Sequence, residues 1–159
     1  MSRQGKTGSA VVLTDKELLR VYKTILGSAN GHTSRNYLIV VLSHLCGLRS
    51  KEISSLPISA VWDGEKVLDT LRLLGEYTKG NHHRDVPLTN KKVRDAIQKH
   101  ISNEMEVGGG QVNMTAPLLK SQKGGFFNAN SMVHLIKRIY EDAGLGNASS
   151  HSGRRKFAT

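Results

Sequence analysis

Three short basic segments hold the residues best suited to chemistry. Arg49 stands at a predicted helix junction, Lys79 lies beside the turn-forming pair at residues 80–81, and His151 and Arg154 stand where a last helix is predicted to begin. A guanidinium binds phosphate oxygens through two parallel hydrogen bonds and stays charged at any working pH. An imidazole titrates near neutrality. These side chains could bind a phosphate group and move a proton beside it.

Each segment alone also has a plainer interpretation. Arg49 could simply pair with Glu52, three residues further along a helix. Lys79 could be a solvated residue that discourages strand pairing at a sheet edge. A basic helix start at residues 151–156 could be a solvated face. Only the three segments together favour a shared function.

In this order the segments resemble the tyrosine recombinase family, which includes the phage integrases. Its members carry Gly-Leu-Arg-x-x-Glu, a lysine on a β-hairpin, and His-x-x-Arg opening a helix. Here Arg49 and Glu52, Lys79, and His151 and Arg154 occupy the matching places. The resemblance covers residues 13–159 and implies the family's catalytic-domain fold.

The surrounding residues add detail to the resemblance. Arg-x-Val-Pro-Leu follows the hairpin turn from Arg84, and Phe-Ala-Thr ends the chain after the His-x-x-Arg segment. Leucine is commoner in the family where this chain has Gly153, and many members have histidine and threonine at Arg155 and Lys156. A histidine-serine-glycine-arginine-arginine sequence resembles a variant found in some bacterial and phage integrases.

The resemblance implies DNA integration or recombination through a 3′-phosphotyrosine intermediate. It makes Arg49 and Arg154 the groups that bind the nonbridging oxygens of the transition state. It makes Lys79 the acid that protonates the leaving 5′ oxygen, and His151 a group that hydrogen-bonds the phosphate or handles the nucleophile's proton. These groups neutralise charge as metal ions do in other nucleases, so no metal, ATP or other cofactor is expected. Glu52 would orient Arg49 or pack within the fold.

Double-stranded DNA is the expected partner. The residues predicted to contact it are His82, His83, Arg84, Arg155 and Lys156. No further ligand stands at metal-binding spacing near the two adjacent histidines, so a zinc site is not expected there. We expect self-association on DNA in the full-length protein, no membrane contact and no small-molecule substrate.

The family's tyrosine nucleophile is missing from this span. Family members continue with a further histidine or tryptophan and then the tyrosine, whereas this chain ends at Thr159. Tyr22, Tyr37 and Tyr140 fall on apolar helical stripes and are predicted to be core or partly buried residues. Tyr77 lies near Lys79, where a DNA contact suits it better than nucleophilic attack. We therefore expect an enzyme family but an inactive span, the alternative function being a DNA-binding fragment that does not cleave.

The apolar periodicity predicts a mainly α fold with a small three-stranded antiparallel sheet. Residues 1–12 are predicted to be a flexible basic tail, and residues 13–159 a catalytic domain that lacks its C-terminal helices. Thr14 should cap the first helix, which ends by Gly27. Further helices are predicted at residues 34–46, 50–56, 90–106 and 128–143, with a last one starting near Ser150.

Composition agrees with a nucleic-acid partner. The net charge is +10 and the pI about 10.0 over 159 residues, and such a positive field attracts polyanions. A basic protein that binds RNA or acidic partners remains an alternative. The single cysteine, Cys46, should be buried and cannot form an internal disulfide, which favours a reducing cytoplasm. With the resemblance, that means the cytoplasm of a bacterial or phage-infected cell.

Overall fold

The computed structural model describes residues 11–75 and 82–158. Its elements are α1 (Asp15–Leu26), α2 (Thr33–Leu45), α3 (Ser50–Ser54), the 3-10 turn η2 (Ile58–Ala60), β1 (Thr70–Leu73), β2 (Arg84–Pro87), α4 (Lys91–Val107), α5 (Ala129–Asp142) and α6 (Ser152–Ala158). The mainly helical prediction is confirmed, and the helix bounds differ from the predicted ones by two residues or fewer. Lys79, Tyr77 and Thr159 lie outside the described residues.

The first helix begins where its sequence predicts. Thr14 Oγ1 accepts a hydrogen bond from the backbone N–H of Glu17 at 3.1 Å, and the Glu17 carboxylate accepts one from the Thr14 N–H at 2.9 Å. This reciprocal capping satisfies two backbone donors that have no partner within the helix. Leu18, Val21 and Ile25 then form the buried stripe of α1.

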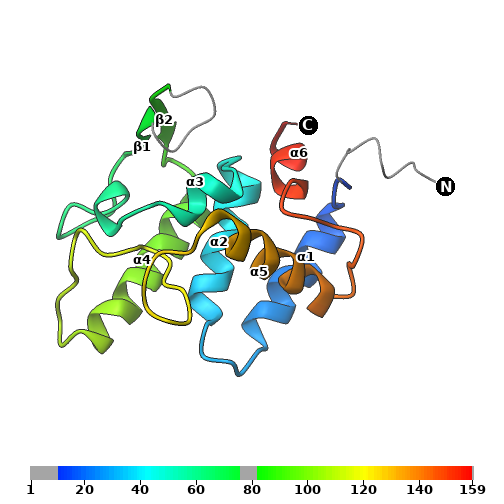
Figure 1. Ribbon diagram of the computed structural model, residues 1–159, viewed down its shortest axis with the longest axis horizontal. Coiled ribbons are helices and arrows are strands. Elements are labelled where there is room, and N and C mark those ends of the chain that lie inside the picture. The colour runs from blue at the N-terminus through cyan, green and yellow to red at the C-terminus, as the bar shows by residue number, and fades with distance from the viewer. Residues whose placement is uncertain (1–10, 76–81, 159) are drawn as a thin grey trace.

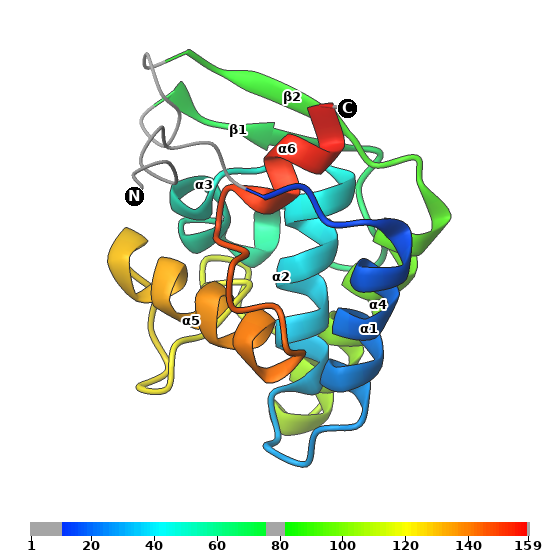
Figure 2. The ribbon, with the colours of Figure 1, turned by 90° about the vertical axis from the view of Figure 1, so that its right-hand side faces the viewer.

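Helix α2 is the centre of the molecule. Figure 2 shows it between α5 on one side and α1 and α4 on the other, with α6 against its C-terminal end. The uninterrupted apolar run Leu38, Ile39, Val40, Val41 and Leu42 is at most 1% exposed. A helix that is apolar all round must be covered all round, so the sequence of α2 fixes its central place. Its C-terminal end points toward α3 and α6 (Figure 1).

The sheet corrects the prediction of three strands. Within the described ranges it has two antiparallel strands, β1 and β2, paired from Thr70 with Pro87 to Leu73 with Arg84. The segment expected to give a third strand makes only one isolated bridge, between Trp62 and Val67. A tight turn fills the space between those two residues, because Asp63 accepts hydrogen bonds from the two backbone N–H groups of residues 65 and 66. The ladder does not extend outward from this bridge, because the 3-10 turn η2 ends at Ala60 and leaves no strand before Trp62.

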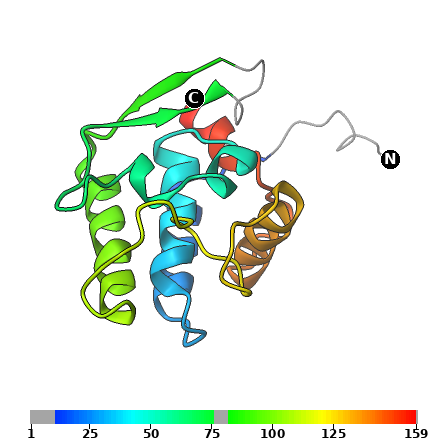
Figure 3. The same ribbon diagram turned by 60° about the vertical axis from the view of Figure 1, so that its left-hand side comes forward.

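The sheet lies at the end of the molecule that also carries α3 and α6 (Figure 3). Leu71 and Leu73 of β1 are buried, while Thr70 and Arg72 are exposed. This alternation directs one face of the strand to the core. Strand β2, α3 and α6 therefore bring Arg84, Arg49 and Arg154 to one end of α2.

Candidate functional site

Gly47 makes the turn that leads from α2 to Arg49. Its φ is +68°, in the left-handed region that glycine adopts readily. A Cβ at this position would lie 2.5 Å from the Phe157 ring. The turn therefore requires glycine for its backbone conformation and for the close approach of α6. It places Arg49 immediately before the first residue of α3.

Glu52 holds the start of α3 in place. Its carboxylate is fully buried and accepts a hydrogen bond from the backbone N–H of Arg49 at 2.8 Å. The Arg49 guanidinium approaches the same carboxylate at 3.5 Å, with 36% of its side chain exposed. Glu52 thus both orients Arg49 and packs within the fold, the two roles that the sequence left open.

The guanidinium of Arg84, on β2, binds Glu52 more closely than the guanidinium of Arg49 does. Its Nη1 donates to Oε2 and its Nη2 to Oε1, each at 3.1 Å. This two-pronged geometry is the strongest kind of arginine–carboxylate contact. It connects the sheet to α3 across 32 residues of sequence.

Arg154 comes to the same place from α6. Its Nη1 donates to the Gly47 carbonyl at 2.7 Å, across 107 residues of sequence. Burial lowers the pKa of Arg154, and the positive charges of Arg49 and Arg84 lower it further. Three guanidinium groups therefore influence one another around the buried carboxylate of Glu52.

A pocket opens beside two of these arginines. Arg84 and Arg154 line it together with Gly47, Asp85 and Phe157, and its volume is about 390 Å³. Three guanidinium charges gather near two carboxylates, the buried one of Glu52 and the exposed one of Asp85. That local excess of positive charge can hold an anion such as a phosphate group.

Of the other residues with predicted roles, His151 and Arg155 lie among the described residues and Lys79 does not. His151 is exposed just before α6, where its backbone N–H donates to Ser149 Oγ at 3.3 Å. Arg155 is also exposed, on α6. Both are accessible to a large ligand. Lys79 lies outside the described residues, so its predicted role stays a prediction.

The remaining predicted DNA contacts divide into two groups. His82 and His83 are exposed before β2, and His83 Nδ1 accepts a hydrogen bond from the Gly75 N–H at 2.9 Å. Lys156 instead reaches back to the start of α1. Its ammonium donates to the Leu13 carbonyl at 3.0 Å and pairs with Asp15 at 2.8 Å. The structure therefore brings Arg49, Arg84 and Arg154 together and directs Lys156 elsewhere.

The packing of α6 depends on a residue to which the sequence gave no role. Gly153 lies against Ser43 of α2, and a Cβ there would be 2.8 Å from Ser43 Cβ. The departure from the family's commoner leucine was the available signal. It could not be interpreted without knowing which residue of α2 faces position 153.

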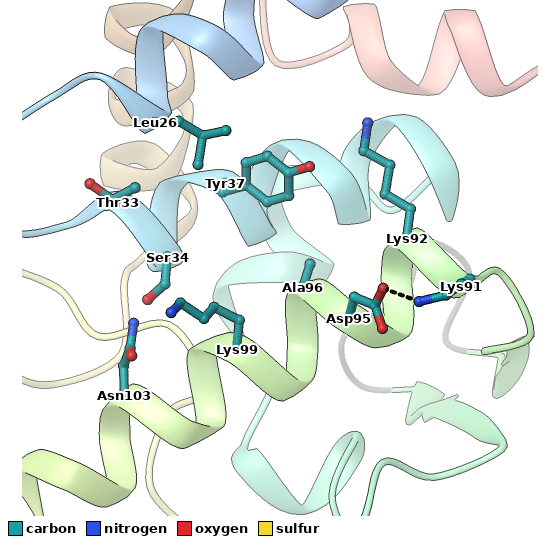
Figure 4. Close-up of a pocket in the computed structure, with 10 residues that line it drawn as sticks. All are labelled: Leu26, Thr33, Ser34, Tyr37, Lys91, Lys92, Asp95, Ala96, Lys99 and Asn103. Atoms are coloured by element: carbon teal, nitrogen blue, oxygen red, sulfur yellow. Dashed lines mark hydrogen bonds and ion pairs between the residues drawn. The ribbon is translucent and has the colours of Figure 1, made fainter.

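A larger pocket lies away from these arginines. It lies along α4, facing α1 and α2, measures about 680 Å³, and is shown in Figure 4. Leu26, Tyr37 and Ala96 give it an apolar lining, and Lys91 and Lys99 are among its charged residues. It contains none of the residues predicted to do chemistry.

No cluster of three or more histidine, cysteine, aspartate or glutamate side chains in residues 11–75 and 82–158 could hold a metal ion. In the same residues no helix combines the length and the apolar character needed to cross a bilayer.

Comparison with known proteins gives a match along most of the chain. The family model described as "Phage integrase family" matches residues 11–159. No curated protein sequence matches. Among solved structures, XerA recombinase aligns with a TM-score of 0.68 at 18% identity, over 93% of this chain and 48% of XerA. The chain thus spans about half of that relative.

Two further structures share the fold. XerH site-specific recombinase, in a pre-cleavage complex with its difH substrate, has a TM-score of 0.65 at 23% identity and covers 92% of this chain and 41% of XerH. The lambda integrase catalytic core has a TM-score of 0.65 at 17% identity, over 94% of this chain and 81% of that core.

Proposed function

Because the chain belongs to the phage integrase family, we propose that it forms the phosphate-binding part of a phage- or mobile-element-type integrase. Such an enzyme performs site-specific DNA integration or recombination and joins strands through a 3′-phosphotyrosine intermediate. The observation that carries the proposal is the convergence of Arg49, Arg84 and Arg154 from three separate elements around Glu52.

The proposed chemistry follows from the charges of this site. Attack on a phosphodiester places additional negative charge on its nonbridging oxygens in the transition state. Before the reaction begins, Glu52 holds the backbone of Arg49 and the Gly47 carbonyl holds the guanidinium of Arg154. Cations that are already at the site stabilise the transition state without the cost of reorganising solvent. His151, exposed beside them, is assigned to the phosphate or to the nucleophile's proton, and Lys79 to the leaving oxygen.

One observation favours the alternative that this chain by itself binds DNA without cutting it. Tyr22 and Tyr140 are at most 4% exposed, and burial raises the pKa of both phenols. Tyr37 lines the separate pocket of Figure 4. Tyr22 and Tyr140 are therefore too deeply buried to attack a phosphate, and the pocket that Tyr37 lines contains none of the arginines.

DNA binding is tested by the salt dependence of affinity. The dissociation constant of the chain for a short duplex would be measured over a series of salt concentrations. Each phosphate contact adds about 0.9 to the slope of log affinity against log salt. We expect Arg49→Ala and Arg154→Ala each to lower the slope by about that amount. Arg20→Ala, which removes an exposed arginine of α1, is the matched control and should leave the slope unchanged.

Equal slopes for the unmodified chain and the three variants would overturn the assignment of Arg49 and Arg154 as phosphate-binding residues. Binding to single-stranded RNA as tight as to duplex DNA at matched salt would favour a general polyanion-binding protein instead.

Strand cleavage is tested separately. We expect the 159-residue chain not to nick supercoiled plasmid. Nicking would contradict that expectation and would move the search for the nucleophile to Tyr77. In a longer chain that carries the tyrosine, we expect a covalent adduct with a suicide DNA substrate and its loss in Arg49→Ala. We also propose self-association on DNA for the full-length protein; the lambda integrase structure bound to a Holliday junction is a tetramer.

A further inference from the structure

Glu52 is shared unequally between two arginines. Both of its oxygens accept hydrogen bonds from Arg84 at 3.1 Å. The Arg49 guanidinium lies at 3.5 Å from one oxygen, which is longer than an ordinary N–H···O hydrogen bond. The backbone N–H of Arg49, unlike its guanidinium, binds Glu52 at short range, at 2.8 Å. The carboxylate therefore fixes the backbone of Arg49 and holds its side chain loosely.

We propose that Arg84 is a positioning residue that occupies the Glu52 carboxylate and thereby leaves the Arg49 guanidinium free to bind a phosphate. This inference rests on the proposed function, because it concerns the use of Arg49 on DNA. It assigns Arg84 a role through Glu52, different from the direct DNA contact predicted for it from the sequence.

Arg49 would take the place of Arg84 at Glu52 because Glu52 is buried. Its side chain is fully buried, so water cannot solvate the charge, and a carboxylate in that setting needs a close cationic partner. Arg84 is that partner in the folded chain. If Arg84 is removed, Arg49 is the next guanidinium, only 3.5 Å away. A small rotation would bring its fork onto Glu52 and withdraw it from the solvent side of the site.

Arg154 does not enter this competition. Its Nη1 is bound to the Gly47 carbonyl at 2.7 Å, so its position does not depend on which arginine holds Glu52. Loss of Arg84 should therefore affect one phosphate contact, that of Arg49, and leave the contact of Arg154.

The competing explanation is that Arg84 touches phosphate itself. About a third of its side chain is exposed, and it lines the pocket beside Arg154. The two explanations differ when variants are combined. A direct contact by Arg84 is lost whatever stands at position 52, whereas a positioning role disappears once position 52 no longer carries a negative charge.

The experiment is a set of variants measured with the same short duplex and salt series. We expect Arg84→Ala to lower the salt slope by about 0.9, as Arg49→Ala does. Combining Arg49→Ala with Arg84→Ala should cause no further loss. Combining Glu52→Gln with Arg84→Ala should restore the slope of Glu52→Gln alone, because a neutral amide no longer captures Arg49. Additive losses in the first pair, or no recovery in the second, would overturn the proposal.

A second measurement makes the result independent of DNA. The side-chain NMR signals of Arg49 report how freely its guanidinium rotates. We expect slower rotation in Arg84→Ala than in the unmodified chain, and return to fast rotation when Glu52→Gln is added. Unchanged rotation in Arg84→Ala would refute the capture of Arg49 even if the chain does not bind DNA. Failure of DNA binding with slowed rotation would refute only the proposed function.

Folding is checked by circular dichroism for every variant. Should Arg84→Ala fail to fold, Arg84→Lys supplies the same comparison, since a lysine keeps the charge and loses the two-pronged contact. It is expected to slow Arg49 rotation in part, and rotation as fast as in the unmodified chain would count against the proposal.

Discussion

Gly153 of α6 lies against Ser43 of α2 with no room for a side chain between them. A Cβ on Gly153 would overlap Ser43 Oγ and would lie 2.9 Å from the Ser43 carbonyl carbon. This contact is made between the helix that carries Arg154 and α2, which ends two residues before Gly47. It sets the depth at which α6 sits, and hence the reach of Arg154 to the Gly47 carbonyl.

Gly153→Ala is expected to destabilise the chain by about 1–3 kcal/mol, as overfilling a packed contact generally does. The overlap involves backbone as well as side-chain atoms of Ser43, so a rotamer change cannot relieve it. Urea unfolding followed by circular dichroism measures the effect. Gly146→Ala is the control, because a Cβ at Gly146 meets nothing within 4 Å. An equal unfolding midpoint for Gly153→Ala and the unmodified chain would contradict the close contact.

Gly47→Ala is expected to lower both stability and DNA affinity. An alanine at φ +68° costs on the order of 1 kcal/mol, and its Cβ would also meet the Phe157 ring. Adding Phe157→Ala removes the overlap and leaves the backbone strain, so it should recover part of the stability. Thermal unfolding of the single and double variants separates the two causes. Full recovery in the double variant would show that the backbone conformation at Gly47 carries no strain.

His44 is expected to make the chain less stable in mild acid. Burial, with a smaller effect from Lys156, lowers the pKa of His44 from 6.5 to about 4, and its Nε2 shares a 2.8 Å hydrogen bond with the Tyr140 hydroxyl. The unfolded chain therefore takes up a proton that the folded chain excludes, and stability present above pH 6.5 is lost as the pH falls toward 4. At about 1.4 kcal/mol per pKa unit, the loss is on the order of 3 kcal/mol.

The measurement is the free energy of unfolding in urea over that pH range, for the unmodified chain and for His44→Gln. The variant should lose stability less steeply as the pH falls. It should not become independent of pH, because burial also lowers the pKa of His100. Parallel curves would show that His44 is not the source.

Cys46 is expected to be unreactive in the folded chain. It is 6% exposed, and burial raises the pKa of its thiol to about 11. Because the thiolate is the reactive form, Ellman's reagent at pH 8 should modify the native chain at least about a hundredfold more slowly than free cysteine. Addition of urea should release one reactive thiol at once. Rapid reaction without urea would show that the segment around Cys46 opens readily.

The sequence by itself determined what depends on neighbours along the chain. The capping residue Thr14 marked the start of α1, and apolar periodicity predicted the helix at residues 34–46. The segments around Arg49, Lys79 and His151, taken together, carried the resemblance to the family. These features are local, because helix periodicity, capping and short motifs involve residues a few positions apart.

The tertiary structure decided which of these residues meet. Arg84 binds Glu52 over 32 residues, Arg154 binds Gly47 over 107, and Lys156 binds Leu13 over 143. The third predicted strand was wrong because the 3-10 turn at Ile58–Ala60 limits that segment to one isolated bridge. Partners this far apart in the sequence are brought together by the packing of whole helices against α2. The types of the two residues in such a pair do not indicate that they will meet.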